Sequence, residues 1–283
     1  MIETAPSKNP SPTAGKPLAL SVRDVTLTYP NGVRALNRLS LDVAEGEFVA
    51  VIGPNGSGKS SLLRVLAGLQ TCDSGDIYVS GEKIDGLDSR ARARRVALVP
   101  QLLEVLPGYS VQYFVLMGRY AHLSAWHLYT ARDRELAQES LRLVDAAQFA
   151  ERGMDEMSGG ERQRAMVARA LAQESRTILL DEPTSALDLS HQLKVYSLIH
   201  DLQRNAGRTV VVVTHDLNLA SQFADRLVLL KDGSVAADDV PAQVLRREIL
   251  EPVYGPDLAF GVFERTCSGS PRPWVLPWAR PLN

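Results

Sequence analysis

Residues Glu47-Phe-Val-Ala-Val-Ile-Gly-Pro-Asn-Gly-Ser-Gly-Lys-Ser60 join an apolar run, a glycine-rich turn and the start of a helical segment. The apolar run predicts a buried strand over residues 47–52. The periodicity that follows the turn predicts a helix over residues 60–66 that ends at Gly68. A strand, a tight turn and a helix in this order are typical of an α/β unit.

The turn itself fits the pattern of Gly, four residues and Gly-Lys-Ser, over Gly53–Ser60. Glycines allow backbone N–H groups to surround phosphates, and the N-terminus of a helix favours negative charge. We therefore predict a phosphate-binding loop, in which Lys59 neutralises the outer phosphates and Ser60 offers its hydroxyl to Mg²⁺.

Outward from this loop, short β-branched runs alternate with longer amphipathic stretches from Leu20 onward. Thr177–Leu180 and Thr209–Val213 are two further apolar runs of this kind, so we predict an α/β fold with a largely parallel sheet. Between about Ser110 and Ala172 the periodicity is helical throughout. This interval predicts a helical subdomain inserted in the α/β core, over about residues 104–172.

The composition is that of an ordinary globular protein, and 283 residues are enough to bury a large core. Lys and Arg number 31 against 33 Asp and Glu, and the formal net charge of −2 gives no global attraction to nucleic acid. Cys72 and Cys267 lie far apart and match neither a metal-ligand spacing nor a disulfide framework. This use of cysteine fits a reducing cytosol.

The two ends of the chain differ from the rest in composition. Residues 1–17 are rich in Pro, Ser, Lys and Thr without the apolar stretch of a secretory signal, which predicts a disordered leader. Residues 264–283 are predicted to form an extended, Pro-rich tail, with docking through Trp274 and Trp278 as one option. The longest apolar runs, such as Phe48–Ile52, are far shorter than the roughly 20 residues that cross a bilayer.

A second acidic site, Asp181-Glu182, directly follows the apolar run Ile178–Leu180. Adjacent residues at the end of a strand point to different sides. One carboxylate can therefore face Mg²⁺ while the other addresses a water near the terminal phosphate. Taken alone, the pair also fits two solvated loop acids.

A third element, Met157-Ser-Gly-Gly-Glu161, opens the helical run Arg162–Leu171. Here the chain resembles the ATP-binding-cassette (ABC) ATPases, whose signature peptide usually reads Leu-Ser-Gly-Gly-Gln. This sequence differs from that peptide at the first and fifth positions. The element lies about a hundred residues after the phosphate loop and about twenty before Asp181-Glu182, which is the family's order and spacing.

The resemblance covers nearly the whole span from Leu20 to Tyr254 and implies a P-loop NTPase core over residues 18–263, with an antiparallel β region near the N-terminus. It also implies roles. Tyr29 stacks on adenine, Gln101 senses Mg²⁺ and the γ-phosphate, and Ser185–Asp188 crosses a dimer interface. His215 is the switch histidine, and Glu182 is the general base.

The implied cofactors are ATP and Mg²⁺, and the implied catalytic residues are Glu182, His215 and Lys59. The residues implied to bind nucleotide are Tyr29, Gly53, Pro54, Asn55, Gly56, Ser57, Gly58, Lys59, Ser60, Ser61, Gln101, Ser158, Gly159, Gly160, Glu161 and Asp181. The residues implied to hold Mg²⁺ are Ser60, Gln101 and Asp181.

Glu161 has a local explanation beside the family one. Ser158-Gly-Gly-Glu161 is a capping box, in which the side chains of Ser158 and Glu161 each bond the other's backbone N–H. A glutamate caps a helix as well as a glutamine does. Contact between Glu161 and the nucleotide stays open beside the capping role.

The resemblance implies partners. Two cassettes stack head to tail, so that Gly53–Ser60 of one subunit and Ser158–Gly160 of the other enclose each ATP. Two transmembrane permease subunits would bind this homodimer at the cytoplasmic face of the membrane, with a periplasmic or extracellular binding protein as an indirect partner. The segment 109–129 holds six of the chain's seventeen aromatic residues, namely Tyr109, Tyr113, Phe114, Tyr120, Trp126 and Tyr129. They fit either an interface with the permease or the core of the subdomain itself.

The cargo prediction rests on finer resemblance. Met117–His122, Ala170–Gln173, Leu187–Gln192 and His215–Ala220 resemble the importers of iron-siderophores, haem and cobalamin, although Ala121 stands where that group more often has proline. The chain is thus predicted to be the ATPase that energises such an importer. The alternatives are an ABC ATPase of another importer or of an exporter, and a soluble ABC ATPase outside transport. Two features of the sequence disfavour the soluble class, because the chain has one phosphate loop and no sustained heptads.

Overall fold

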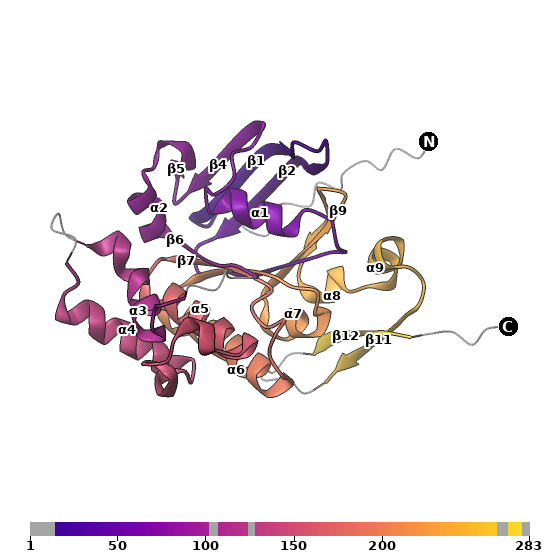
Figure 1. Ribbon diagram of the computed structural model, residues 1–283. Helices are drawn as coiled ribbons and strands as arrows, with labels where there is room; N and C mark the ends of the chain where they lie inside the picture. Colours follow the sequence, from indigo (N-terminus) through magenta and orange to yellow (C-terminus); the bar gives the residue numbers. More distant parts are fainter. Residues whose placement is uncertain (1–14, 102–106, 124–127, 265–270, 279–283) are drawn as a thin grey trace.

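The computed structural model describes residues 15–101, 107–123, 128–264 and 271–278 (Figure 1). Most of the predicted leader, Trp126 and Cys267 lie outside these described residues. The first residues of the predicted helical subdomain, 104–106, also lie outside them.

The central sheet has six strands in the order β10-β9-β3-β8-β7-β6. Its strands are β3 (Phe48–Ile52), β6 (Val96–Val99), β7 (Thr177–Asp181), β8 (Thr209–Val213), β9 (Arg226–Lys231) and β10 (Ser234–Asp239). All neighbours pair in parallel except β10, which runs antiparallel to β9. The three strands predicted from apolar runs are therefore confirmed, and every residue of β3, β7 and β8 is buried.

A second, antiparallel sheet has the order β2-β1-β4-β5, which confirms the β region expected near the N-terminus. Its strands are β1 (Leu18–Thr28), β2 (Arg34–Ala44), β4 (Ser74–Val79) and β5 (Glu82–Lys83). Helix α1 (Lys59–Leu66) shares one core cluster with both sheets, because Leu62 and Leu63 belong to the same buried cluster as Leu20 of β1 and Val49 of β3. The predicted helix after the phosphate loop is thus confirmed.

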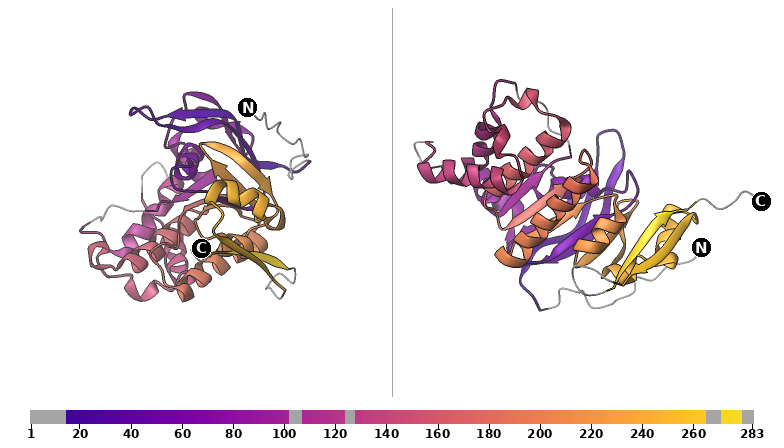
Figure 2. Two further views of the ribbon diagram at one scale, coloured as in Figure 1. Left: turned by 90° about the vertical axis from the view of Figure 1, so that its right-hand side faces the viewer. Right: turned by 90° about the horizontal axis from the view of Figure 1, so that it is seen from below.

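The opposite face of the central sheet carries the helical part of the chain (Figures 1 and 2). After α2 (Ser89–Arg95) come α3 (Val111–Leu116), the 3₁₀ segment η2 (Met117–His122), α4 (Ala131–Leu143) and α5 (Gly159–Ala172). The described residues between 110 and 172 hold helices, 3₁₀ turns and one isolated bridge from Ser110 to Gly153, as the periodicity predicted. Helices α6 (Leu189–Ala206) and α7 (Leu217–Phe223) complete this face.

The chain ends with α8 (Pro241–Val244), α9 (Arg247–Tyr254) and the hairpin of β11 (Leu258–Phe263) and β12 (Arg272–Pro277), on the side away from the helical subdomain (Figure 2). The predicted tail is extended over β12, and it docks on α7 through Asn218 and Ser221. Trp274 packs over Gly261, whereas the Trp278 side chain is 64% exposed. The pairing of β11 with β12 crosses the boundary predicted at residue 263.

Candidate active site

The phosphate loop connects β3 to α1 with three glycines at positive φ, namely Gly53, Gly56 and Gly58. A Cβ atom on Gly53 would lie 2.4 Å from the carbonyl oxygen of Leu230, and one on Gly58 would lie 2.3 Å from that of Ala35. Both contacts are shorter than packed atoms allow. Glycine is therefore required at these two positions, because neighbouring backbone leaves no room for a side chain.

Lys59 begins α1 and points back over the loop. Its Nζ donates hydrogen bonds to the carbonyl oxygens of Gly53 and Pro54, both at 2.8 Å, and only 7% of the residue is exposed. Burial lowers the pKa of the Lys59 ammonium, while the charges of Glu182 and Asp181 act in the opposite direction. A cation is thus fixed at the loop, where phosphate oxygens would replace the two carbonyl acceptors.

Two features of the loop fit a bound anion. The Ser57 hydroxyl is buried and has no hydrogen-bond partner among the described residues. The first turn of α1 carries no side-chain cap and no acidic residue, so its N–H groups are available to an anion. Asn55 and Gly56 are exposed, and Tyr29 lies beside α1 with its hydroxyl 3.1 Å from Ser61 Oγ.

The acidic pair lies at the end of β7, and its two carboxylates diverge as predicted. Asp181 is the last residue of the strand, and its Oδ1 accepts a hydrogen bond of 3.0 Å from Ser60 Oγ. Burial raises the pKa of Asp181; the Ser60 bond opposes this shift, and the charge of Glu182 adds to it. A cation bound between Ser60 and Asp181 would relieve this cost, so the donor set fits Mg²⁺.

Glu182 faces the other way. Its Oε2 accepts a hydrogen bond of 2.8 Å from Gln101 Nε2 and lies 3.5 Å from His215 Nδ1. Gln101 follows β6 and His215 follows β8, and both side chains are exposed. The carboxyl ends of neighbouring parallel strands meet at one edge of a sheet, which explains why residues so distant in sequence converge here.

The signature peptide forms the capping box that the sequence predicted. Ser158 Oγ accepts from Glu161 N at 3.3 Å, and Glu161 Oε2 accepts from Ser158 N at 2.8 Å. Arg152 Nη1 lies 3.3 Å from Glu161 Oε1. Both carboxylate oxygens of Glu161 are therefore occupied by residues of its own chain.

The signature peptide also contacts the loop Ser185–Asp188. A Cβ on Gly160 would lie 3.2 Å from Leu187 Cδ2, so these two segments are closely packed. Asp188 caps α6 by accepting from His191 N at 2.9 Å and pairing with His191 Nδ1 at 2.8 Å, and these bonds lower the pKa of Asp188. In the described part of the chain, no hydrogen bond or ion pair joins the signature peptide to the phosphate loop.

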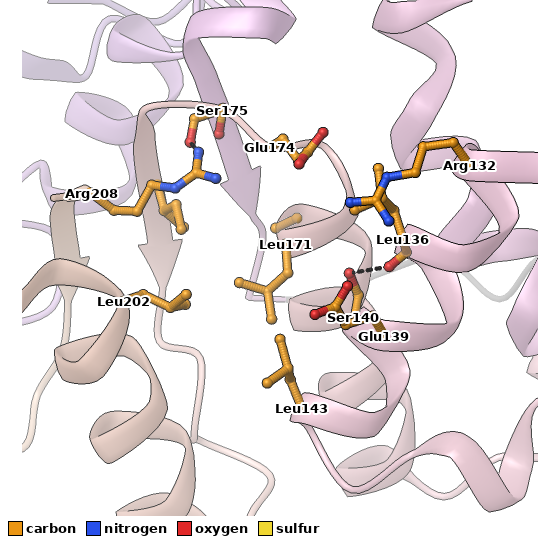
Figure 3. Close-up of a pocket in the computed structure, with 12 residues that line it drawn as sticks. Arg132, Leu136, Glu139, Ser140, Leu143, Leu171, Glu174, Ser175, Leu202 and Arg208 are labelled. Carbon is orange, nitrogen blue, oxygen red and sulfur yellow. Dashed lines mark hydrogen bonds between the residues drawn. The ribbon is translucent and has the colours of Figure 1, made fainter. Parts of the chain in front are cut away.

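The predicted site and a cavity on the helical side of the molecule have no residue in common. The cavity, of ≈ 260 Å³, lies between α4, the end of α5 and α6, and Figure 3 shows Arg132, Leu171 and Arg208 on its walls. Gln163, a buried residue of α5, bonds Glu182 but is not among the predicted site residues, because a polar residue within an amphipathic helix carries no distinctive signal.

Comparison with known proteins shows the family to which a chain with this site belongs. The ABC transporter family matches residues 36–185, more than half of the chain. The chain belongs to the ABC transporter family. As an ABC ATPase it binds and hydrolyses ATP, and the predicted fold class is confirmed.

This ABC cassette is similar to the ferric enterobactin transport ATP-binding protein FepC of Escherichia coli, at 37% identity over 256 residues, which are 90% of this chain and 93% of that protein. It is also similar to a metal-chelate type ABC transporter solved in an inward-facing conformation, with 31% identity and a TM-score of 0.79 over 93% of this chain and 98% of that one. A cassette solved as a dimer with ADP and phosphate matches with 34% identity and a TM-score of 0.73, over 78% of this chain and 98% of that one. None of the helices in the described residues of our cassette has the length and apolarity that a membrane crossing requires.

Proposed function

We propose that this ABC cassette is the ATP-hydrolysing subunit of a membrane importer for a metal chelate, namely siderophore-bound iron, haem or cobalamin. The observation that carries the hydrolytic part is the Glu182 carboxylate, held by Gln101 and His215 beside the Ser60–Asp181 pair. The cargo class is supported by the similarity to the enterobactin subunit and to the metal-chelate transporter.

In this proposal each group has a defined task. The phosphate loop binds the phosphates through its backbone N–H groups and the Ser57 hydroxyl, and Lys59 neutralises the outer phosphates. Ser60 and Asp181, with Gln101 nearby in the same site, would hold Mg²⁺, which when bound neutralises charge on the phosphate oxygens.

Glu182 is the proposed general base. Its carboxylate accepts a proton from the attacking water, while Gln101 and His215 fix the direction in which it points. His215 is also proposed to hold the γ-phosphate side of the closed site. Tyr29 is proposed to stack on the adenine.

The site is proposed to be completed by a second copy of the cassette. Ser158 and Gly159 are exposed, and neither they nor Gly160 bond the phosphate loop of their own subunit. An exposed signature peptide fits a head-to-tail dimer in which these residues close on the partner's nucleotide. The similar cassette solved as a dimer with ADP and phosphate supports this arrangement.

The permease is proposed to bind the helical subdomain at the cytoplasmic face of the membrane, with a binding protein engaged only through the permease. Tyr109, Tyr113 and Tyr120 are 41%, 43% and 55% exposed, whereas Phe114 is fully buried. Tyr109 and Tyr113 stack with ring centroids 5.6 Å apart. Three exposed tyrosines on a small subdomain favour an interface, whereas Phe114 lies in the core and the partly buried Tyr129 packs against it.

The residues behind the finer cargo resemblance are structural. Arg119 is 6% exposed, and it donates to Asp133 at 2.9 Å and to Glu174 at 2.7 Å. His122 Nε2 lies 2.8 Å from the carbonyl oxygen of Gln173. The cargo proposal therefore depends on the relatives and not on a contact with cargo.

The test is uptake in a strain that lacks this chain. We expect loss of ATP-dependent uptake of at least one of ferric siderophore, haem or cobalamin, restored by the parental chain but not by Lys59→Ala. Normal accumulation of all three, with no redundant system present, would contradict the cargo class and leave the ATPase in place. That outcome would favour one of the alternative functions, namely an importer of another cargo, an exporter or an ABC ATPase outside transport. Sedimentation with membranes only when the permease is present separates transport from a soluble role.

A further inference from the structure

The backbone of Glu182 is in an unusual conformation. Its φ is +47°, in the left-handed region that residues with a side chain rarely adopt. Such a conformation costs free energy and persists only where several contacts fix it. The Glu182 N–H donates to the carbonyl oxygen of Val213 at 2.9 Å, and the Glu182 carbonyl accepts from Ser185 N at 3.2 Å.

A third contact comes from the helix that begins with the signature peptide. Gln163 lies on α5, one turn after Gly159, and its side chain donates from Nε2 to the Glu182 carbonyl oxygen at 3.2 Å. Only 2% of Gln163 is exposed. Its neighbours Ala165, Met166 and Val167 belong to the hydrophobic core, so this amide is a polar group placed inside an apolar layer.

We propose that Gln163 is a positioning residue that holds the Glu182 backbone in its left-handed conformation and thereby aims the catalytic carboxylate. The inference rests on the proposed role of Glu182 as general base. Without the Gln163 donor, the Glu182 carbonyl oxygen keeps only the bond from Ser185 N, so the peptide after Glu182 is held less firmly and the carboxylate leaves the arrangement with Gln101 and His215. A misplacement of about 1 Å costs up to about a hundredfold in rate.

The same bond links α5 to the base mechanically. The N-terminus of α5 is the signature peptide, and Gly160 packs against Leu187 of the loop that follows Glu182. Segment 182–187 is therefore held by α5 at both ends, through Gln163 and through Gly160. A movement of α5 toward a partner's nucleotide would therefore also move Glu182, the proposed general base, in the same subunit as α5.

Gln163→Met tests the proposal, because methionine keeps the volume and removes the donor. We expect kcat for ATP hydrolysis to fall about tenfold or more, with KM and the Kd for a labelled ATP analogue within about twofold of the parent. Gln163→Glu, which keeps the shape and presents a carboxylate to the carbonyl, should lose kcat at least as strongly. In the Glu182→Gln background, Gln163→Met should lower the residual rate no further, because it acts only through the base.

The matched control is Gln203→Met. Gln203 Nε2 also donates to a backbone carbonyl, that of Gly46 at 2.6 Å, but at the opposite end of the central sheet. This variant should keep the parental kcat with a loss of thermal stability similar to that of Gln163→Met.

Parental kcat in Gln163→Met, alongside an inactive Glu182→Gln, would refute the positioning role and leave the proposed function intact. A raised KM with a far lower melting temperature than Gln203→Met would assign Gln163 a structural role and also overturn the inference. Parental hydrolysis by Glu182→Gln would instead remove the proposed base.

Discussion

Glu161 offers the sharpest test of how the signature peptide is built. Glu161→Ala removes the acceptor of the 2.8 Å bond from Ser158 N and the partner of Arg152 at 3.3 Å. Loss of a whole N-cap costs about 0.5–2 kcal/mol, and the loss here lies within that range because Ser158 Oγ still accepts from the backbone N–H of residue 161. The Arg152 side chain is 40% exposed, so its pair with Glu161 adds at most about 1 kcal/mol. The higher helix propensity of alanine offsets a few tenths of a kcal/mol, so the net loss is centred on about 1–2 kcal/mol.

Glu161→Gln keeps an oxygen that accepts from Ser158 N, and its side chain has the length that the capping box needs. We expect it to unfold within about 0.5 kcal/mol of the parent and to keep at least parental ATPase activity. Thermal melts of the three proteins decide the matter, with Glu161→Ala melting about 2–6 °C lower than the other two. If the glutamine variant melts as low as the alanine variant, the capping explanation is wrong.

The pH dependence adds an independent check. The hydrogen bonds from Ser158, backbone first, lower the pKa of Glu161 below its ordinary value, and Arg152 contributes in the same direction. A carboxyl with a lowered pKa stabilises the fold above its unfolded pKa of about 4.3 and loses this contribution as the pH falls through the folded value. The stability difference between the parent and Glu161→Ala should therefore be full at pH 7 and shrink on acidification below about pH 4. A difference that grows on acidification would contradict the assignment.

Three further predictions test the rest of the site. Glu182→Gln should bind ATP with parental affinity and lose turnover, and it should accumulate as an ATP-bound dimer in sizing experiments with Mg²⁺. A variant that stays monomeric or hydrolyses ATP at the parental rate would contradict the role of Glu182 as general base. Lys59→Ala should weaken binding of a labelled ATP analogue by about tenfold or more, because a fixed cation on the phosphates is lost, and unchanged affinity would exclude this loop as the nucleotide site. Gly58→Ala should destabilise the fold by more than about 1 kcal/mol in denaturant melts, whereas Gly56→Ala, whose Cβ meets nothing within 4 Å, should cost less; equal losses would contradict the crowding at Ala35.

The sequence predicted the parts of this cassette that depend on local pattern. The phosphate loop, its strand and its helix follow from one contiguous stretch, since glycine positions, apolar run and helical period all agree. The capping box at Ser158 and Glu161 was also predictable, because both partners lie within one helical turn. The diverging carboxylates of Asp181 and Glu182 follow from the alternation of side chains along a strand.

The parts that depend on tertiary contact were not predictable in this way. The left-handed backbone of Glu182 and its bond from Gln163 join residues 19 positions apart on different elements, and neither residue stands out in composition. The hairpin of β11 and β12 was missed as well, because Pro273 and Pro277 argue against a strand in a single-sequence reading. A two-stranded sheet consists only of edges, and that is where proline is tolerated.

The residues that resemble those of metal-chelate importers make structural contacts within the chain. His191 bonds the Asp188 carboxylate that caps α6, and Gln192 Nε2 donates to the carbonyl oxygens of Thr184 and Leu187. These bonds fix the loop after Glu182, as Arg119 and His122 fix η2 on the end of α5. All of these contacts are made within the chain, and none of them is a contact with cargo. The resemblance at these positions therefore gives no physical contact from which the cargo could be read, and uptake by cells, not nucleotide chemistry, has to decide the cargo.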